Sequence, residues 1–399
     1  MPRPAFKNWI THVQTARTEQ LLKYAAQSEV ISFAGGLPAE ELFPAAELEE
    51  AFQTVITEQA AEALQYTWAE GCERLREHIV AQMKERGLNV TAQNIIVTSG
   101  AQQGLDLLAK LFLSRGDPML IESPTYVPAI QAFEMHAPQF LPVARDSKGI
   151  DIDALRRGLL QRDPRLFYLI PAGHNPTGSV LTREQQRELL AATSGTHVQI
   201  IEDAAYADIQ LDDNSARSNP LLPVELSRIL YLGSFSKVLS PGLRVGWIAA
   251  SPEVIRQLAL IKQASDLQTS TLNQLVLARY FDSNALKDQI ARCVPFYRQR
   301  RDVMLESLAA EFPSEARWTK PAAGFSVWVE LPQNCDTEDL LTQAVGRGVA
   351  FEPGRPFFVT QKPRNYLRLS YSNLPPEHIR SGVRRLGEVL KRAVSQSKV

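Results

Sequence analysis

From about residue 90, short apolar runs alternate along the chain with longer stretches in which apolar residues recur at helical spacing. The runs are nearly continuous in apolar residues, which is typical of strands buried on both faces of a parallel sheet. The predicted strands are 94–98, 118–122, 165–170, 198–202, 228–232 and 244–250, and the first predicted helices between them are 101–113 and 127–136. This order predicts an α/β fold with a mainly parallel sheet that helices cover on both faces.

The C-terminal part follows a different pattern. A long helix is predicted over 284–311, and after it come a strand (324–331), a helix (337–347), a strand (366–371) and a helix (376–395). This mixture indicates a smaller α+β domain, and 399 residues exceed what one ordinary core accommodates. We therefore predict a large domain over 41–290 and a small domain formed by 1–40, which include an N-terminal arm, together with 291–399.

The composition indicates a globular protein, with 44% hydrophobic and 22% charged residues. The 43 basic and 44 acidic residues give no indication of a nucleic-acid or anionic-membrane partner. No run has the length of a membrane-spanning helix, and the N-terminus lacks the apolar core of a signal peptide. Cys72, Cys293 and Cys335 share no metal-binding spacing, so we expect buried, reduced thiols, no metal site and a cytoplasmic location.

Short polar motifs follow the predicted strands, at the sheet edge where parallel sheets bind ligands. The motifs are Ser99-Gly-Ala-Gln102, Ser123-Pro-Thr-Tyr126, Asn175-Pro-Thr-Gly178, Asp203-Ala-Ala-Tyr206, Ser234-Phe-Ser-Lys237 and Arg244. Each motif alone is also compatible with a turn or a helix N-terminus. Their succession at the ends of consecutive strands predicts one shared ligand site.

Lys237 is the most informative residue among these motifs. It follows the apolar run 229–232, two serines lie close by, and Arg244 comes seven residues later. These surroundings suit an amine that binds an aldehyde cofactor as an imine, with phosphate ligands beside it.

Four phrases carry a resemblance to a known family: 32–38, Asn175-Pro-Thr-Gly178, 233–244 and 365–371. The chain resembles the fold-type I pyridoxal-phosphate aminotransferases of the aspartate aminotransferase superfamily along almost its whole length. Within that superfamily it is most similar to the 2-aminoadipate and kynurenine aminotransferase-like branch. The resemblance implies pyridoxal 5'-phosphate as cofactor and a ping-pong reaction through internal aldimine, quinonoid and pyridoxamine phosphate. It also implies that an L-amino acid donates its amino group to a 2-oxo acid, with 2-oxoglutarate as the expected acceptor.

The same resemblance assigns roles around the cofactor ring. Lys237 would form the imine and afterwards move the proton at the substrate Cα. Asp203 would pair with the ring nitrogen and keep it protonated. Tyr206 and Asn175 would hydrogen-bond the phenolic oxygen, and Tyr126 would stack on the ring face. Lys237, Asp203 and Tyr206 are therefore the expected catalytic residues.

The cofactor phosphate is expected at the start of the predicted helix 101–113, where backbone N–H groups and the helix dipole favour an anion. The residues expected around it are Gly100, Ala101, Gln102, Ser234, Ser236 and Arg244. Relatives often carry Ser or Thr at the position of Ala101, so we expect one phosphate hydrogen bond fewer here.

The resemblance also indicates how substrate is bound. Arg368 is the candidate for the substrate α-carboxylate, with an exposed arginine on an edge strand as the alternative. Asn175 would contribute to this contact, and Gly36 lies in a loop expected to close over the substrate. Tyr66 corresponds to a tyrosine that reaches the phosphate of the neighbouring subunit, which implies a homodimer with shared active sites.

Substrate preference in this branch depends on the N-terminal helix. Some relatives that use 2-aminoadipate carry an arginine where this chain has Glu19, and Arg17 would point elsewhere on a helix. A glutamate repels an acidic side chain, so we expect broad use of aromatic and aliphatic amino acids rather than strict 2-aminoadipate specificity.

Two other functional classes are compatible with this resemblance. The same fold supports β- or γ-lyases, decarboxylases and cyclising synthases, since the cofactor promotes cleavage of any of three bonds at Cα. Fused transcriptional regulators carry a related domain behind an N-terminal DNA-binding domain. The chain starts directly at the arm, so we do not expect a regulator.

Several other residues invite interpretation. We expect His174 to position a loop rather than to act as a base. The basic cluster 298–301 is interpreted as the solvated face of a long helix. Trp68, Trp247 and Trp328 are interpreted as packing residues, with a place at the substrate entrance as the alternative for Trp68.

Overall fold

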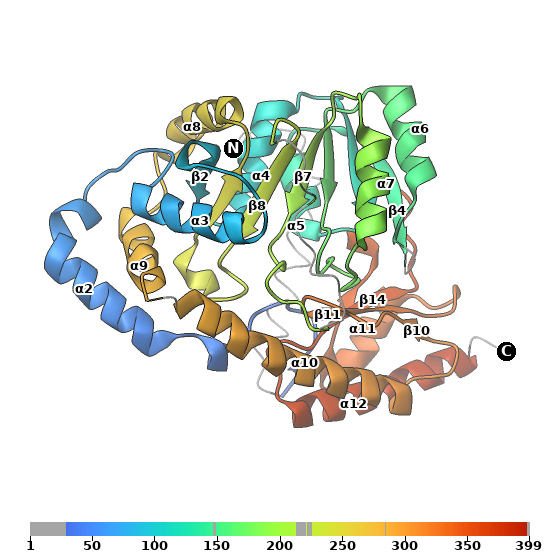
Figure 1. The fold of residues 1–399 in the computed structure, drawn as a ribbon. Coiled ribbons are helices and arrows are strands. Elements are labelled where there is room, and N and C mark those ends of the chain that lie inside the picture. Colours follow the sequence, from blue (N-terminus) through green and yellow to red (C-terminus); the bar gives the residue numbers. More distant parts are fainter. Residues whose placement is uncertain (1–28, 147–148, 213–220, 222–225, 284, 397–399) are drawn as a thin grey trace, which may run out of the picture.

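The computed structural model describes residues 29–146, 149–212, 221, 226–283 and 285–396 (Figure 1). Its centre is an eight-stranded sheet with the order β2-β9-β8-β7-β6-β3-β4-β5. The strands are β2 (Ile95–Thr98), β3 (Pro118–Ser123), β4 (Gln139–Asp146), β5 (Gly149–Ile150), β6 (Leu166–Leu169), β7 (Gln199–Asp203), β8 (Ile229–Ser234) and β9 (Gly246–Ala249). Strands β8, β7, β6, β3 and β4 run parallel to one another, whereas β9 is antiparallel to both β8 and β2, and β5 is antiparallel to β4. The prediction of a mainly parallel sheet is confirmed.

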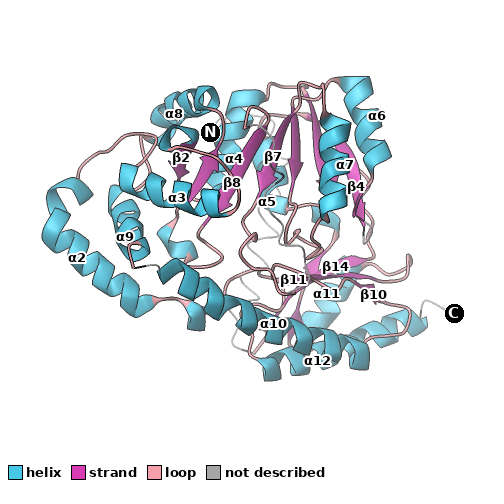
Figure 2. Cartoon of the chain, viewed as in Figure 1, coloured by secondary structure: helices cyan, strands magenta, loops and turns pink. Residues whose placement is uncertain are grey.

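Alternation along the strands directs apolar side chains to both faces of this sheet. Met119 and Ile121 of β3 join one buried cluster, and Leu120 between them joins another. The first cluster is covered by α4 (Ala101–Phe112), α5 (Val127–Glu134) and α8 (Pro252–Asp266), and the second by α6 (Ile152–Arg162) and α7 (Arg183–Thr193). Figure 2 shows helices on both faces, as the sequence predicted. Helix α3 (Glu73–Glu85) packs against β2, α9 (Thr271–Phe281) packs against α3, and α2 (Ala45–Ala63) packs against α9.

A second, antiparallel sheet lies next to the carboxyl ends of the large one (Figure 1). Its strands, in order, are β10 (Arg317–Trp318), β11 (Ser326–Glu330), β14 (Tyr366–Ser370) and β13 (Glu352–Pro353). The helices around it are α10 (Ala285–Glu311), α11 (Thr337–Val345) and α12 (Pro376–Gln396). Strand β1 (Ile31–Ser32) pairs in parallel with β12 (Val349–Ala350) and so joins the N-terminal segment to this part. The domain boundaries at residues 40 and 290 stay predictions.

Short 3-10 helices complete the described elements: η2 (Glu40–Leu42), η3 (Ala92–Asn94), η4 (Pro241–Leu243) and η5 (Arg355–Phe357). Within the described ranges, no helix is both long enough and apolar enough to cross a membrane.

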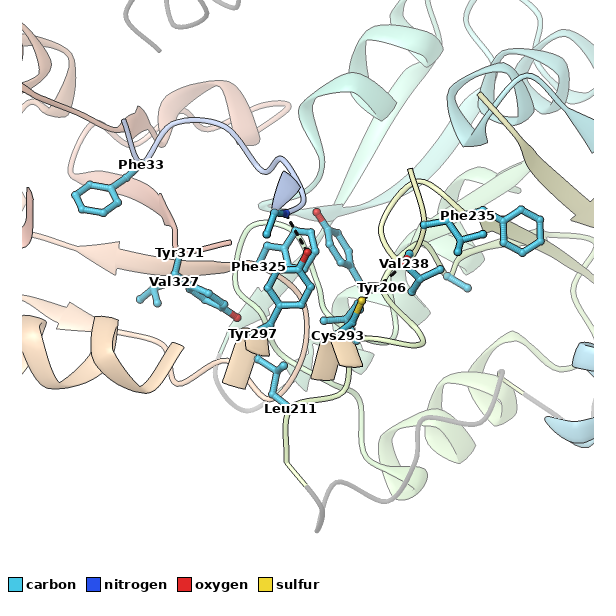
Figure 3. Packing of buried hydrophobic residues seen from close by; sticks show 14 of the residues in the cluster. Phe33, Tyr206, Leu211, Phe235, Val238, Cys293, Tyr297, Phe325, Val327 and Tyr371 are labelled. Carbon is cyan, nitrogen blue, oxygen red and sulfur yellow. Dashed lines mark hydrogen bonds between the residues drawn. The ribbon is translucent and has the colours of Figure 1, made fainter. Parts of the chain in front are cut away.

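Aromatic side chains fill the junction between the two sheets (Figure 3). The ring of Phe325 lies 5.2 Å from that of Tyr206 and 4.4 Å from that of Tyr297, between ring centres. The hydroxyl of Tyr297 accepts a hydrogen bond from the backbone N–H of Ala39 at 3.1 Å. Because these residues come from a strand end of the large sheet, the long helix and the small sheet, their packing fixes the parts relative to one another.

The interpretation of cluster 298–301 as a solvated helix face was wrong for two of its arginines. Only 3% of Arg300 and 8% of Arg301 is exposed. Arg300 donates to the carbonyl of Ser372, pairs with Glu41 at 2.7 Å and lies 4.0 Å above the ring of Phe296. Arg301 pairs with Asp212 and donates to the carbonyl of Pro321. The partners of these hydrogen bonds and ion pairs lie far away in sequence and outside α10, so the helical pattern alone gave no sign of them.

The tryptophans and cysteines follow the predictions with one exception. Trp247 and Trp328 are buried, and so are all three cysteines. Trp68 is 78% exposed, so it does not pack in the core of its own chain.

The burial of Arg300 makes a prediction for stability. We expect Arg300→Met to lower the free energy of unfolding by about 1–3 kcal/mol, because the Ser372 carbonyl loses a charged donor. The control is Lys287→Met, since Lys287 pairs with Glu85 at 2.8 Å while both side chains stay mostly exposed. That change should cost less than about 1 kcal/mol. Urea unfolding followed by circular dichroism measures both, and equal losses would contradict a structural role for Arg300.

Candidate active site

A cavity of about 470 Å³ lies where strand ends of the large sheet meet the N-terminal segment and the small sheet. Its walls include residues of segment 30–37, of the start of α4 and of segment 352–374. The sequence-predicted residues that line it are Gly36, Ala101, Gln102, Tyr126, Asn175, Asp203, Tyr206, Ser234, Ser236, Lys237, Arg244 and Arg368. The chain therefore brings together nearly all the residues that the motifs predicted.

The amine of Lys237 points into this cavity from the turn after β8. It donates a hydrogen bond to the carbonyl of Gly36 at 3.1 Å and lies 5.5 Å from the centre of the Tyr206 ring. Burial lowers its pKa to about 8, and Arg368 and Arg244 act in the same direction, whereas the Asp203 carboxylate opposes them. Near neutral pH the amine is therefore more readily deprotonated than an exposed lysine and is suited to act as a nucleophile or a base.

Asp203 ends β7 and is 96% buried, since only 4% of it is exposed. Its carboxylate accepts hydrogen bonds from the hydroxyl of Tyr168 at 2.8 Å and from the backbone N–H of Ala205 at 3.2 Å. Burial raises its pKa, while these hydrogen bonds and Lys237 oppose the rise. A buried carboxylate in a cavity of this kind suits a cationic partner such as a protonated pyridine nitrogen.

The start of α4 has features that suit an anion. Gly100 precedes the helix with φ of 83°, and no side chain caps the first turn. A Cβ at Gly100 would lie 2.5 Å from Nη2 of Arg244, so glycine lets this guanidinium approach the helix start. The uncapped N–H groups, the helix dipole and Arg244 together suit a phosphate, with Ser234 and Ser236 lining the same cavity.

Two tyrosines border the space between the amine and the anion site. Tyr206 packs edge-on against Phe325. Burial raises the pKa of Tyr206 to about 12 and raises that of Tyr126 as well, so both hydroxyls stay protonated donors at neutral pH. Together with the amine, the carboxylate and the anion site, these groups fit pyridoxal phosphate, whose aldehyde, ring nitrogen, phenolic oxygen and phosphate each find a counterpart.

Arg368 of β14 reaches the same cavity and is only 7% exposed, so the alternative of a surface arginine is wrong. Its guanidinium donates to the side-chain oxygen of Asn175 at 2.9 Å and to the carbonyl of Ala34 at 2.6 Å. It also pairs with the carboxylate of Glu352 and lies 5.3 Å from the Phe357 ring.

Tyr66 does not lie in its own chain's cavity. It is 75% exposed and lines a separate surface hollow with Trp68 and Leu260. Its predicted role in a neighbouring subunit's site stays a prediction.

His174 is buried beside the cavity rather than in it. Its Nδ1 lies 2.8 Å from the Thr177 hydroxyl, and its Nε2 lies 3.5 Å from the Glu122 carboxylate. Burial and the nearby Arg145 lower its pKa, so the ring is neutral. These contacts support the expected role of positioning the loop that carries Asn175.

Several residues of the site were missed in the sequence. Tyr168 belongs to an apolar strand, where its hydroxyl gave no sign of the hydrogen bond to Asp203. Glu122 and Arg145 form a fully buried ion pair, and Glu122 also accepts from the backbone N–H of Ile170. Glu352 lines the cavity but stands in no motif. Each depends on contacts between strands that are distant along the chain.

Comparison with known proteins identifies the family. The model of the family described as aminotransferase class I and II matches residues 28–386 of this chain. The chain belongs to this family. An aromatic-amino-acid aminotransferase of Thermococcus litoralis is 37% identical, and the match covers 95% of this chain and 92% of that protein. A 2-aminoadipate transaminase of Thermus thermophilus is 40% identical, over 97% of this chain and 96% of the other.

A solved structure supports the same conclusion. The α-aminoadipate aminotransferase of Thermus thermophilus, complexed with N-(5'-phosphopyridoxyl)-L-leucine, has a TM-score of 0.91 and 39% identity, with 98% of both chains covered. The chain is thus a pyridoxal-phosphate-dependent aminotransferase of amino-acid metabolism. This assignment favours transamination over the lyase, decarboxylase and synthase alternatives.

The surroundings of Lys237 make a prediction for the aminotransferase without its cofactor. Replacing Arg368 with Met removes a positive charge that lowers the pKa of Lys237, so that pKa should rise. The rate at which the cofactor-free enzyme takes up pyridoxal phosphate, followed by absorbance against pH, should then have its midpoint at higher pH. Arg355→Met is the control, because Arg355 pairs with Glu338 at 3.7 Å and does not line the cavity. An unchanged midpoint in Arg368→Met would contradict the electrostatic account.

Proposed function

We propose that this aminotransferase moves the amino group of aromatic and aliphatic L-amino acids, and of 2-aminoadipate, to 2-oxoglutarate. The observation that carries the proposal is that the Lys237 amine and the Arg368 guanidinium share one cavity. The names of the relatives in Thermococcus litoralis and Thermus thermophilus support the two substrate classes.

Arg368 and Asn175 would bind and orient the substrate. A guanidinium presents planar donors that match a carboxylate, and the Asn175 side chain, already hydrogen-bonded to Arg368, contributes its amide group beside them. Holding the α-carboxylate there directs the substrate Cα towards Lys237, which lowers the entropic cost of the proton transfer.

Lys237 would move the proton. Its pKa of about 8 allows a free-base amine near neutral pH, which can take the proton from the substrate Cα and return it to the cofactor carbon. Pyridoxal phosphate, when bound, supplies the aldehyde that accepts the amino group and the ring that withdraws electrons from Cα. Asp203 would hold the proton on the ring nitrogen, and Tyr206 would donate to the phenolic oxygen.

The cavity walls support a preference for apolar side chains. Val30, Leu37, Val127, Phe357 and Leu374 all line it. Such walls favour aromatic and aliphatic substrates, whose burial removes apolar surface from water. The predicted contribution of Glu19 and Arg17 lies outside the described residues.

We further propose a homodimer with shared active sites. The surface around Tyr66 is apolar, since Leu64, Trp68, Leu260 and Leu267 are also more than half exposed. Exposed apolar side chains in this number mark protein contact surfaces, and a second copy of the chain would cover them. This placement supports a role for Tyr66 at the phosphate of the partner's site.

The two half-reactions of transamination are tested separately. Addition of phenylalanine, leucine or 2-aminoadipate to the cofactor-loaded enzyme should bleach its yellow colour and yield the 2-oxo acid, and 2-oxoglutarate should restore the colour. We expect Lys237→Ala to lower the rate by at least about 1,000-fold, because proton transfer loses its base. Lys262→Met is the matched control, since Lys262 is also buried with a pKa lowered to about 8 but lies outside the cavity. Release of ammonia or carbon dioxide would overturn the proposal.

Shared sites are tested with mixed dimers of Tyr66→Ala and Lys237→Ala subunits. A hybrid would hold one site with both defects and one intact site. Refolding the two variants together at equal amounts should therefore give about a quarter of the normal activity beyond the residual activity of the parental dimers, since about half the dimers are hybrids. No recovery in a mixture shown to contain hybrids would place Tyr66 outside the partner's site.

A further inference from the structure

Glu352 brings a carboxylate to the guanidinium that the proposed function assigns to the substrate. Glu352 and Arg368 are direct partners in the antiparallel pairing of β13 with β14, so their side chains leave the same face of the sheet. The carboxylate of Glu352 pairs with Nη2 of Arg368, and both residues line the cavity. The two side chains are 17% and 8% exposed, respectively, so water screens their contact little.

The partners of the Arg368 nitrogens determine how a substrate carboxylate can bind to this guanidinium. Nη1 donates to Asn175, whereas Nη2 donates to the Ala34 carbonyl and also pairs with Glu352. Nε has no hydrogen-bond partner among the described residues. A carboxylate binds a guanidinium bidentately through Nη1 and Nη2 or through Nε and Nη2. Both arrangements need Nη2, which Glu352 already contacts.

Charge adds to this geometric conflict. With Glu352 ionised, the pair with Arg368 carries no net charge, so its attraction for a second carboxylate is weak. The nearest carboxylate that an incoming α-carboxylate meets at this guanidinium is then Glu352 itself. Lys237 and Arg244 supply positive charge elsewhere in the cavity, and Asp203 supplies negative charge near Lys237.

We propose that Glu352 competes with the substrate carboxylate for Nη2 of Arg368 and thereby sets how tightly the site holds a carboxylate. This inference rests on the proposed function of Arg368. Glu352 lowers the contribution of the α-carboxylate to the binding of every amino acid, whatever its side chain.

Substrate binding is then linked to a proton. Burial raises the pKa of Glu352, and Arg368 opposes this rise. When a substrate carboxylate displaces Glu352 from Nη2, Arg368 no longer counteracts the rise in the pKa of Glu352. Glu352 then takes up a proton. Tyr126 at the start of α5 is the other titratable group that Glu352 faces in the cavity. On α11, which also packs against β13, Glu338 pairs with Arg355 at 3.7 Å, and Asp339 is exposed. Carboxylate affinity should therefore fall as the pH rises.

The test uses the cofactor-loaded enzyme and 3-phenylpropionate, a carboxylate without an amino group that cannot be transaminated. Isothermal titration calorimetry between about pH 6 and about pH 8.5 measures its affinity, and two buffers of different ionisation enthalpy give the proton uptake. Near pH 8, Glu352→Gln should bind it about tenfold more tightly than the unchanged enzyme. The variant should also show a flatter dependence on pH and a smaller proton uptake.

Two controls isolate the carboxylate of Glu352. Glu338→Gln, a change on the neighbouring α11 outside the cavity, should leave 3-phenylpropionate binding unchanged. 2-Phenylethylamine, which lacks a carboxylate, should gain no affinity in Glu352→Gln. Retained cofactor and an unchanged thermal midpoint show that the variant is folded.

Equal or weaker binding of 3-phenylpropionate by Glu352→Gln, with the same dependence on pH, would overturn the proposal and make Glu352 a residue that orients Arg368. If the variant does not fold, binding without proton uptake by the unchanged enzyme would overturn it. Failure of the proposed function is distinguishable, because it shows as an absence of amino-group transfer and leaves the calorimetric comparison intact.

Discussion

The guanidinium of Arg368 joins three segments of the chain that are far apart in sequence. It donates to Asn175 and to Ala34, which lie 193 and 334 residues away along the chain, and it pairs with Glu352 on the adjacent strand. A buried guanidinium without partners is strongly unfavourable, so these contacts have to form together. Because the partners are also walls of the cavity, satisfying one buried charge assembles the proposed substrate site.

The charged groups in the cavity also shift one another's pKa values. Burial, Arg368 and Arg244 lower the pKa of Lys237, while Asp203 limits the effect. Burial raises the pKa of Asp203, and the Tyr168 hydroxyl opposes that rise. The same surroundings thus make an amine available as a base and hold a carboxylate ready for a cationic ring. The proposed reaction depends on this pairing of opposite shifts.

The sequence predicted the central fold and most of the site, for physical reasons that also explain the omissions. Strands such as β6 and β8 contain continuous apolar runs, and the motifs at strand ends identified Lys237 and Asp203. Strand β4 was missed because its positions are mostly exposed or half-buried, and sequence gives no direction for β9. Tyr168 and Glu352 act through pairings across strands. The polar partners of Arg300, Glu41 and Ser372, are distant along the chain, so its burial was not predictable from helical spacing.

The most direct test of the central claim is to find the lysine that holds the cofactor. Borohydride fixes pyridoxal phosphate to that lysine, and peptide mass spectrometry then locates the added mass. The account predicts the mass on the peptide that contains Lys237. Lys262 is the strict alternative, because it too is buried and has a pKa lowered to about 8. Cofactor mass on Lys262, or on any lysine other than Lys237, would contradict the account.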